Sequence, residues 1–191
     1  MRNIIYTLSL SLLLSGCIVF DKKSTAVTFH QFNIPTVAPT KDSPTIFIPR
    51  VQVPAAVRRP TLVISDSSGK TVIDDSQRWV YSLDRAMSDV IGHHLTQITG
   101  LPYSTQAPSE KHLVLLVEVL QFGVNDNATI LQINYHVETS TGETLTQGQG
   151  IWRGKRAQSA KEFVDLQSNN LSAASAEISQ ALLPILSKLS Q

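Results

Sequence analysis

The sequence predicts an α/β fold: a two-layer sandwich in which one mixed or mostly antiparallel sheet packs against two amphipathic helices. Short segments with alternating or β-branched apolar residues, separated by turn residues, cover 28–73 and 112–152. Two longer segments, roughly 80–98 and 159–189, repeat apolar residues every three or four positions. Each of these helices has one apolar stripe, which the sheet would cover. With 42% hydrophobic residues, 16% charged residues and a formal net charge of +1, the composition favours a folded domain over a nucleic-acid-binding or disordered chain.

The N-terminal segment has the three parts of a secretory signal. Arg2 supplies the basic start, Ile4 to Leu14 the apolar centre, and Ser15-Gly16 the small residues of a cleavage site. The apolar run is shorter than the roughly 20 residues that a membrane-spanning helix needs. We therefore predict that residues 1–16 are a signal peptide.

The end of this segment, Leu14-Ser15-Gly16-Cys17, resembles the lipobox of bacterial lipoproteins, in which the cysteine is acylated after cleavage behind the glycine. The alternative is an ordinary signal peptide that happens to end near a buried cysteine. Each buried acyl CH₂ contributes about 0.8 kcal/mol, so two or more chains, palmitate included, would make Cys17 a durable anchor. Cys17 is the only cysteine, and its acylation would leave no thiol for a disulfide, a metal or a nucleophile.

The residue after the lipobox bears on the choice of membrane. Gram-negative lipoproteins with aspartate directly after the cysteine are usually retained in the inner membrane, but here Ile18 holds that position and Asp21 comes too late. We therefore expect the outer membrane, on its periplasmic face. Residues 17–26 would be the lipidated N-terminus and tether, with Asp21 to Thr25 as a polar spacer that keeps the domain away from the headgroups. Alternatively, Lys22 and Lys23 would touch anionic lipid. Residues 27–191 would form a single periplasmic domain, large enough for one core.

Five segments in the first half suggest strands and loops. The expected strands are Thr28–Phe32, Thr45–Val53, Thr61–Ile64 and Thr71–Ile73, and a proline-rich loop covers Asn33–Pro44. The last two strands would form a hairpin because Asp66-Ser67-Ser68-Gly69 has a turn composition.

The first helix is the strongest prediction in the chain. Its apolar stripe comprises Val80, Leu83, Met87, Val90, Ile91, Leu95 and Ile98. Ser82 could cap its start, Asp84 suits the helix dipole there, and Gly100 with Pro102 would end it.

The second half suggests a three-strand meander and a second helix. His112–Phe122 is apolar enough for a central strand covered on both faces or a packed ladder; Ala128–Glu138 and Glu143–Trp152 follow. Gly148 and Gly150 suggest a bulge or an edge in the third strand. The helix would run from about Ser159 to Leu189 with a kink at Pro184, and an interruption at Asn169-Asn170 is left open.

Several motifs together resemble a known family. Val53-Pro54, Arg59-Pro60-Thr61-Leu62-Val63 and Arg78-Trp79 followed by Leu83 are similar to the PqiC-like group of auxiliary lipoproteins of ABC-type and MCE intermembrane transport systems. An aromatic first strand, Phe29-His30-Gln31-Phe32, adds to the likeness. Two departures concern Ser82, where the family often has proline, and Ala55-Ala56-Val57, which replaces a tyrosine-leucine pairing.

The resemblance implies a protein that is not an enzyme. It would connect a periplasmic MCE-domain protein (PqiB-like) and its inner-membrane components to the outer membrane, in a homo-oligomeric ring if several copies assemble. Two other functions are weighed against this one: a lipid-binding or assembly-chaperone lipoprotein of the envelope, and an envelope hydrolase. We expect no cofactor and no nucleic-acid partner.

Arg59, Pro60, Arg78 and Trp79 are the candidate residues for a partner contact or a structural motif. In the structural interpretation, Trp79 fills the core at the start of the first helix. Arg78 then contacts backbone carbonyls or pairs with Asp74 or Asp75. In the functional interpretation, the four residues form an interface.

Other motifs indicate little chemistry. Gly69-Lys70-Thr71 lacks the earlier glycine of a phosphate-binding loop and precedes a strand. His93-His94 are adjacent and would point about 100° apart on a helix, so they cannot chelate a metal together. No Gly-x-Ser-x-Gly motif occurs.

Two charged clusters leave alternatives open. Asp74-Asp75 would lie in a turn or at the start of a helix, with acid/base chemistry as the other possibility. The basic residues Arg153, Lys155, Arg156 and Lys161 would lie in a solvated loop or would meet headgroups or an acidic partner. We predict no catalytic and no metal-binding residue.

Overall fold

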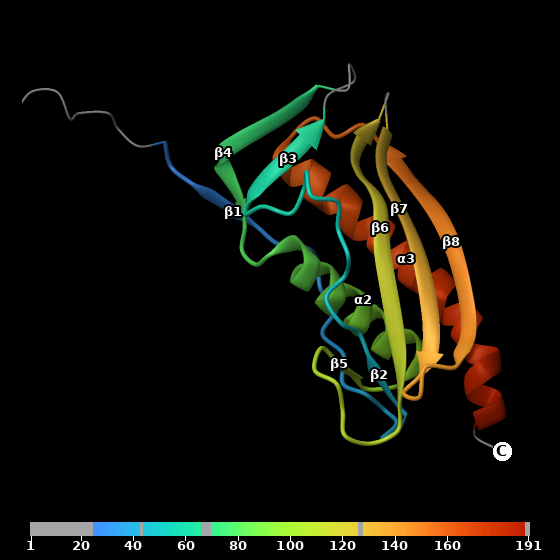
Figure 1. The fold of residues 1–191 in the computed structure, drawn as a ribbon. Coiled ribbons are helices and arrows are strands. Elements are labelled where there is room, and N and C mark those ends of the chain that lie inside the picture. The colour runs from blue at the N-terminus through green and yellow to red at the C-terminus, as the bar shows by residue number, and fades with distance from the viewer. Residues whose placement is uncertain (1–24, 43, 66–69, 126–127, 190–191) are drawn as a thin grey trace, which may run out of the picture.

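The computed structural model describes residues 25–42, 44–65, 70–125 and 128–189 (Figure 1). The predicted signal peptide, the cleavage after Gly16 and the lipidation of Cys17 lie outside these residues. So do residues 66–69, for which a turn is expected. Within them the expected order of strands, helix, three-strand meander and helix is confirmed.

The larger sheet has five strands in the order β5-β2-β6-β7-β8. β6 (His112–Asn125), β7 (Ala128–Thr139) and β8 (Thr144–Lys155) form the antiparallel meander, and the short strands β2 (Thr45–Phe47) and β5 (Tyr103–Ser104) pair parallel beside it. β8 is one of the two edge strands, which agrees with the bulge or edge that its glycines predict.

The smaller sheet has three strands in the order β1-β4-β3. β3 (Thr61–Ser65) and β4 (Thr71–Trp79) are antiparallel, as the expected hairpin requires, and β1 (Thr28–His30) pairs parallel with the end of β4. The mixed α/β class with two helices is therefore confirmed, but the strands are divided between two sheets instead of one.

The two helices, α2 (Leu83–Thr99) and α3 (Ala160–Leu189), lie on the same face of the five-stranded sheet (Figure 1). α3 packs against β7, β8 and α2. The buried residues form a single cluster between helices and strands, which includes Met87, Leu95, Leu115, Ile133, Val137, Phe163, Leu171, Ile178 and Leu182. None of the helices among the described residues is long and apolar enough to cross a membrane.

α2 starts later than predicted, but it ends where the sequence predicts. The helix begins at Leu83, so Val80 lies before it and is exposed. Ser82 occupies the N-cap position but its side chain makes no capping hydrogen bond. Gly100 ends the helix as expected: its φ of 76° is left-handed, and its N–H bonds the carbonyl of Thr96 at 2.8 Å.

Several strand boundaries also differ. β1 ends at His30 instead of Phe32, and β6 reaches Asn125 instead of Phe122. β2 ends at Phe47, and only an isolated bridge from Gln52 to Glu118 continues the pairing toward Val53. β4 is longer than predicted and includes Asp74 and Asp75, which are therefore strand residues. β8 reaches Lys155, so Arg153 and Lys155 belong to a strand and not to a loop.

α3 continues without interruption through the two asparagines. Asn170 is buried, and its Nδ2 donates to Gln167 Oε1 at 3.2 Å. Gln167 Nε2 in turn donates to the carbonyl of Ile130 in β7 at 2.9 Å. These bonds give both side chains a partner inside the protein and connect the helix to the sheet. Pro184 lies inside α3, which extends to Leu189.

Candidate functional site

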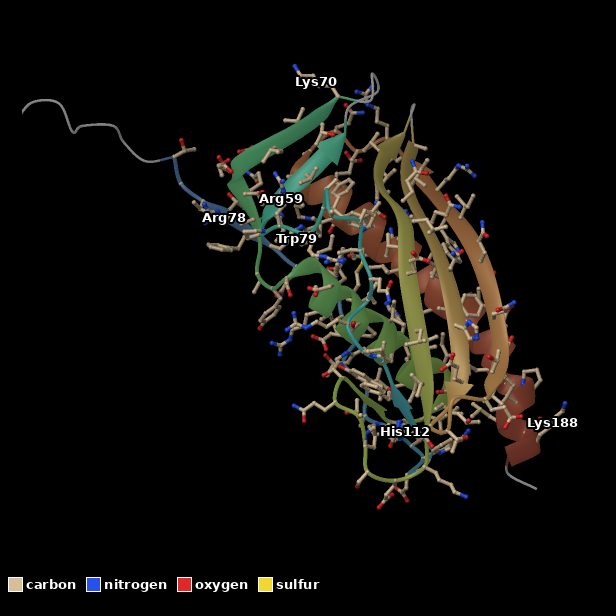
Figure 2. All side chains as sticks on the ribbon, in the orientation of Figure 1. Arg59, Lys70, Arg78, Trp79, His112 and Lys188 are labelled. Carbon is tan, nitrogen blue, oxygen red and sulfur yellow. The ribbon has the colours of Figure 1, made fainter. Side chains whose placement is uncertain are left out.

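The four candidate residues Arg59, Pro60, Arg78 and Trp79 meet where β3 begins and β4 ends (Figure 2). The backbone N–H of Trp79 donates to the carbonyl of Pro60 at 2.8 Å, and Thr61 is the strand partner of Arg78. The structure thus joins two motifs that are separate in the sequence.

Trp79 is the buried part of this junction, with 4% of its surface exposed. Its ring lies 4.9 Å from that of Phe32 and 6.4 Å from that of Phe122, measured between centroids, and Phe122 contacts Phe163 of α3 at 5.5 Å. Tilted and edge-on aromatic pairs at these distances are favourable. The cluster therefore packs the small sheet against β6 and α3, which supports the structural interpretation of Trp79.

The two arginines of the junction are exposed. Arg78 Nε donates to the backbone carbonyl of Asp75 at 3.2 Å, so its described partner is a carbonyl and not a carboxylate. The N–H of Arg59 bonds the carbonyl of Val57 at 2.9 Å, which tightens the turn before Pro60. Both guanidinium groups are accessible to another molecule.

A second surface is the face of the five-stranded sheet that lies away from the helices (Figure 1). Its strand partners form cross-strand rows: Leu116 with His136 and Gln147, and Glu118 with Asn134 and Gln149. Pro49, Arg50 and Gln52 border these rows, and together the residues line a concavity of about 800 Å³.

Apolar side chains interrupt this polar face. Leu116 and Leu120 of β6 and Ile151 of β8 are exposed. β6 was expected to be covered on both faces or to pack in a ladder, and the structure covers only one face, because both helices lie on the same side. The exposed apolar and hydrogen-bonding groups make this sheet face suitable for contact with another protein.

The described residues contain no group of three or more His, Asp or Glu side chains that could hold a metal ion. His93 Nδ1 lies 2.8 Å from the carbonyl of Asp89 and 2.9 Å from the hydroxyl of Tyr103. His94 is half-buried, and this burial lowers its pKa. His93 is thus held by contacts within the fold, and His94 is partly shielded from solvent.

The contact of Gly92 with Tyr103 was missed by the sequence analysis. A Cβ atom at Gly92 would collide with the Tyr103 ring, so the glycine lets β5 approach α2 closely. Burial, with Asp89 nearby, raises the pKa of Tyr103 to about 12. A lone glycine in a strongly periodic helix is the signal that could have indicated this close approach.

Comparison with protein families gives the decisive result. The family model of the ABC-type transport auxiliary lipoprotein component matches residues 31–179. The chain belongs to this family. The auxiliary lipoprotein family is a transport family and not a known enzyme family, and its members are associated with the cell envelope.

Solved structures share the fold of this auxiliary lipoprotein. An uncharacterized protein superimposes with a TM-score of 0.70 at 17% identity, covering 82% of this chain and 99% of its own. Protein XCC0632 from Xanthomonas campestris superimposes with a TM-score of 0.63 at 11% identity, covering 86% and 99%. No curated protein matched in a sequence search.

Proposed function

We propose that the chain is an outer-membrane lipoprotein subunit of an intermembrane lipid transport system of the MCE/Pqi type, which tethers the periplasmic assembly to the outer membrane. The match to a transport auxiliary lipoprotein family carries this proposal. The lipobox-like Leu14-Ser15-Gly16-Cys17 and Ile18 support the anchor and its membrane.

The anchoring half depends on Cys17. Several acyl chains on this residue would hold the domain firmly at the inner leaflet of the outer membrane, because their buried CH₂ groups add up. Labelled palmitate should be incorporated by the full-length chain in a bacterial host and not by Cys17→Ser. The protein should sediment with outer-membrane fractions. An unlabelled wild-type chain would exclude the anchor.

The docking half requires a surface that binds a periplasmic protein. We assign it to the sheet face defined by Leu116, Glu118, Leu120, His136 and Ile151. This face is uncovered by helices, mixes apolar with hydrogen-bonding groups, and includes the concavity at Leu116, Glu118 and His136. Arg59 and Arg78 would be secondary to it, since Pro60 and Trp79 beside them have structural roles.

The complete proposal is tested by purifying the lipidated protein from envelope extracts and identifying bound proteins. Recovery of an MCE-domain protein with its inner-membrane components is expected. Cys17→Ser should lose outer-membrane localisation but keep direct binding to the partner in solution, because the two halves use different surfaces. An intact bait that recovers no MCE-domain protein would contradict the proposal.

A second candidate function, lipid binding by the domain itself, is favoured by one feature. A groove of about 310 Å³ lies between the β3–β4 hairpin and the start of α3. It is lined by Leu62, Ile64, Val72 and Val124, with Arg156 at its border. Native mass spectrometry of Cys17→Ser would detect a co-purified lipid if the protein is a carrier, whereas a tether should be recovered without one.

A further inference from the structure

An exposed apolar surface lies where the described chain begins. Val27, just before β1, and Phe29, within β1, are exposed, and so are Val80 and Tyr81 just after β4. The exposed fractions of Phe29 and Tyr81 are 61% and 52%. Together with Arg78, these residues are called the β1 face below. Exposed apolar side chains that gather at one place and are bordered by polar residues mark surfaces that contact another molecule.

The strand pairing defines how this surface is oriented. His30 is in register with the buried Trp79, and Phe29 is in register with Arg78. Since successive side chains of a strand point to opposite faces, Phe29 and Arg78 share the face directed away from the core. The N–H of Val80 bonds the carbonyl of His30 at 2.9 Å, which places Val80 and Tyr81 directly after the same pair of strands.

The length of the tether limits how far this surface can be from the membrane. Val27 lies ten positions after Cys17, and a fully extended chain of this length spans at most about 35 Å. Figure 2 shows His112 and Lys188 at the opposite end of the molecule from Arg78. Val27 therefore lies within about 35 Å of an acylated Cys17, and β1 is the first described strand after it.

Charged groups of both signs border the β1 face. A concavity of about 360 Å³ is lined by Thr25, Val27, Asp74, Asp75, Ser76 and Arg78. The N–H and Oγ of Ser76 donate to Asp74 Oδ1 at 2.9 and 2.6 Å, and these hydrogen bonds hold the pKa of Asp74 below its ordinary value. Two carboxylates and a guanidinium complement the ammonium and phosphate of a zwitterionic headgroup.

We propose that the β1 face docks on the surface of the phospholipid bilayer in which the acyl chains of Cys17 are embedded. Phe29 and Tyr81 enter the interfacial region, and Arg78 contacts headgroup phosphates. This inference rests on the proposed lipid anchor and adds to it an orientation: the domain lies against the membrane with the small sheet, instead of standing away from it on the spacer. Exposed aromatic residues beside charged groups are the features of proteins that bind membrane interfaces.

The test places a photoreactive phenylalanine analogue in the full-length lipidated chain in bacterial cells. One variant carries it at Phe29 and the control carries it at Leu183, which is 45% exposed on α3 and lies outside both proposed contact surfaces. After illumination, phospholipid adducts should be several-fold more abundant at position 29 than at position 183. Because both positions are exposed, neither variant should disturb folding, which a circular dichroism spectrum checks.

The remaining outcomes distinguish a failure of bilayer docking from a failure of the lipid anchor. Equal lipid adducts at both positions, or protein adducts alone at position 29, would overturn docking on the bilayer. Palmitate labelling of the same cells is the second readout. Labelled protein without lipid adducts at position 29 would refute the β1 face and leave the anchor intact, whereas unlabelled protein would refute the anchor and the docking that depends on it.

Discussion

The backbone N–H of Trp79 donates a hydrogen bond of 2.8 Å to the carbonyl of Pro60. This bond joins the end of β4 to the residue before β3, and it directs the indole into the aromatic cluster with Phe32 and Phe122. One residue earlier, Arg78 faces solvent. Arg78 and Trp79 therefore lie on opposite faces of β4, one at the exposed surface beside β1 and the other in the core.

Trp79→Ala should strongly destabilise the protein. Truncating a buried tryptophan leaves a cavity and typically costs about 3–5 kcal/mol. Urea unfolding followed by circular dichroism would measure the loss in free energy of unfolding. Tyr81→Ala is the control, because an exposed aromatic residue should change stability by no more than about 0.5 kcal/mol. Equal effects of the two substitutions would contradict the assignment of Trp79 to the core.

Gly92→Ala should also destabilise the protein, although alanine is the better helix former by about 0.5–1 kcal/mol. The new methyl group would collide with the Tyr103 ring, and overpacking of this kind costs about 1–3 kcal/mol. In a Tyr103→Ala background the ring is gone, so Gly92→Ala should become neutral or stabilising. A double-mutant cycle from thermal unfolding measures this coupling. Additive effects would show that the ring does not restrict position 92.

The locally determined parts of the fold were predictable from the sequence. The end of α2 at Gly100, the hairpin of β3 and β4, and the meander depend on turn residues and periodicity close to each element.

The remaining features depend on contacts between distant segments. Parallel pairing of β1 with the end of β4 creates the second sheet, and nothing in Thr28–His30 indicates that partner. The end of β8 was missed for a different reason: Arg153 and Lys155 were interpreted by charge, although they alternate with Trp152 and Gly154, which are less exposed. Period-two alternation was the signal for a strand there.

The start of α3 should lose stability in acid. Glu162 N–H donates to Ser159 Oγ at 3.2 Å, and its carboxylate accepts from Lys155 Nζ at 2.6 Å and from the N–H of Gln158 at 2.7 Å. The bond from Lys155 and that from Gln158 lower the pKa of Glu162 from its ordinary 4.5. A lowered folded-state pKa means that this stabilisation is present above the unfolded value and is lost as the pH falls through the folded value.

The difference in free energy of unfolding between wild type and Glu162→Gln should therefore be constant near neutral pH and should shrink below about pH 4.5. Added salt should reduce it, since the pair is exposed. Glu177→Gln, at an exposed glutamate of the same helix, is the control for removing one carboxylate from the helix surface. A difference that persists unchanged to low pH would exclude the carboxylate as its cause.

Substitution of an exposed residue on the sheet face should weaken binding of the transport partner without lowering the stability of the fold. Leu120 and Leu183 have similar exposed fractions, 42% and 45%, but Leu120 lies on the proposed docking face and Leu183 on α3. Leu120→Asp should weaken recovery of the MCE-domain protein several-fold, because a carboxylate at an apolar contact must be desolvated. Leu183→Asp should not, and both variants should unfold at the wild-type urea concentration, since surface substitutions change stability little. If Leu183→Asp alone abolished recovery, the partner would bind the helical side, and the sheet face would have to be assigned to another role.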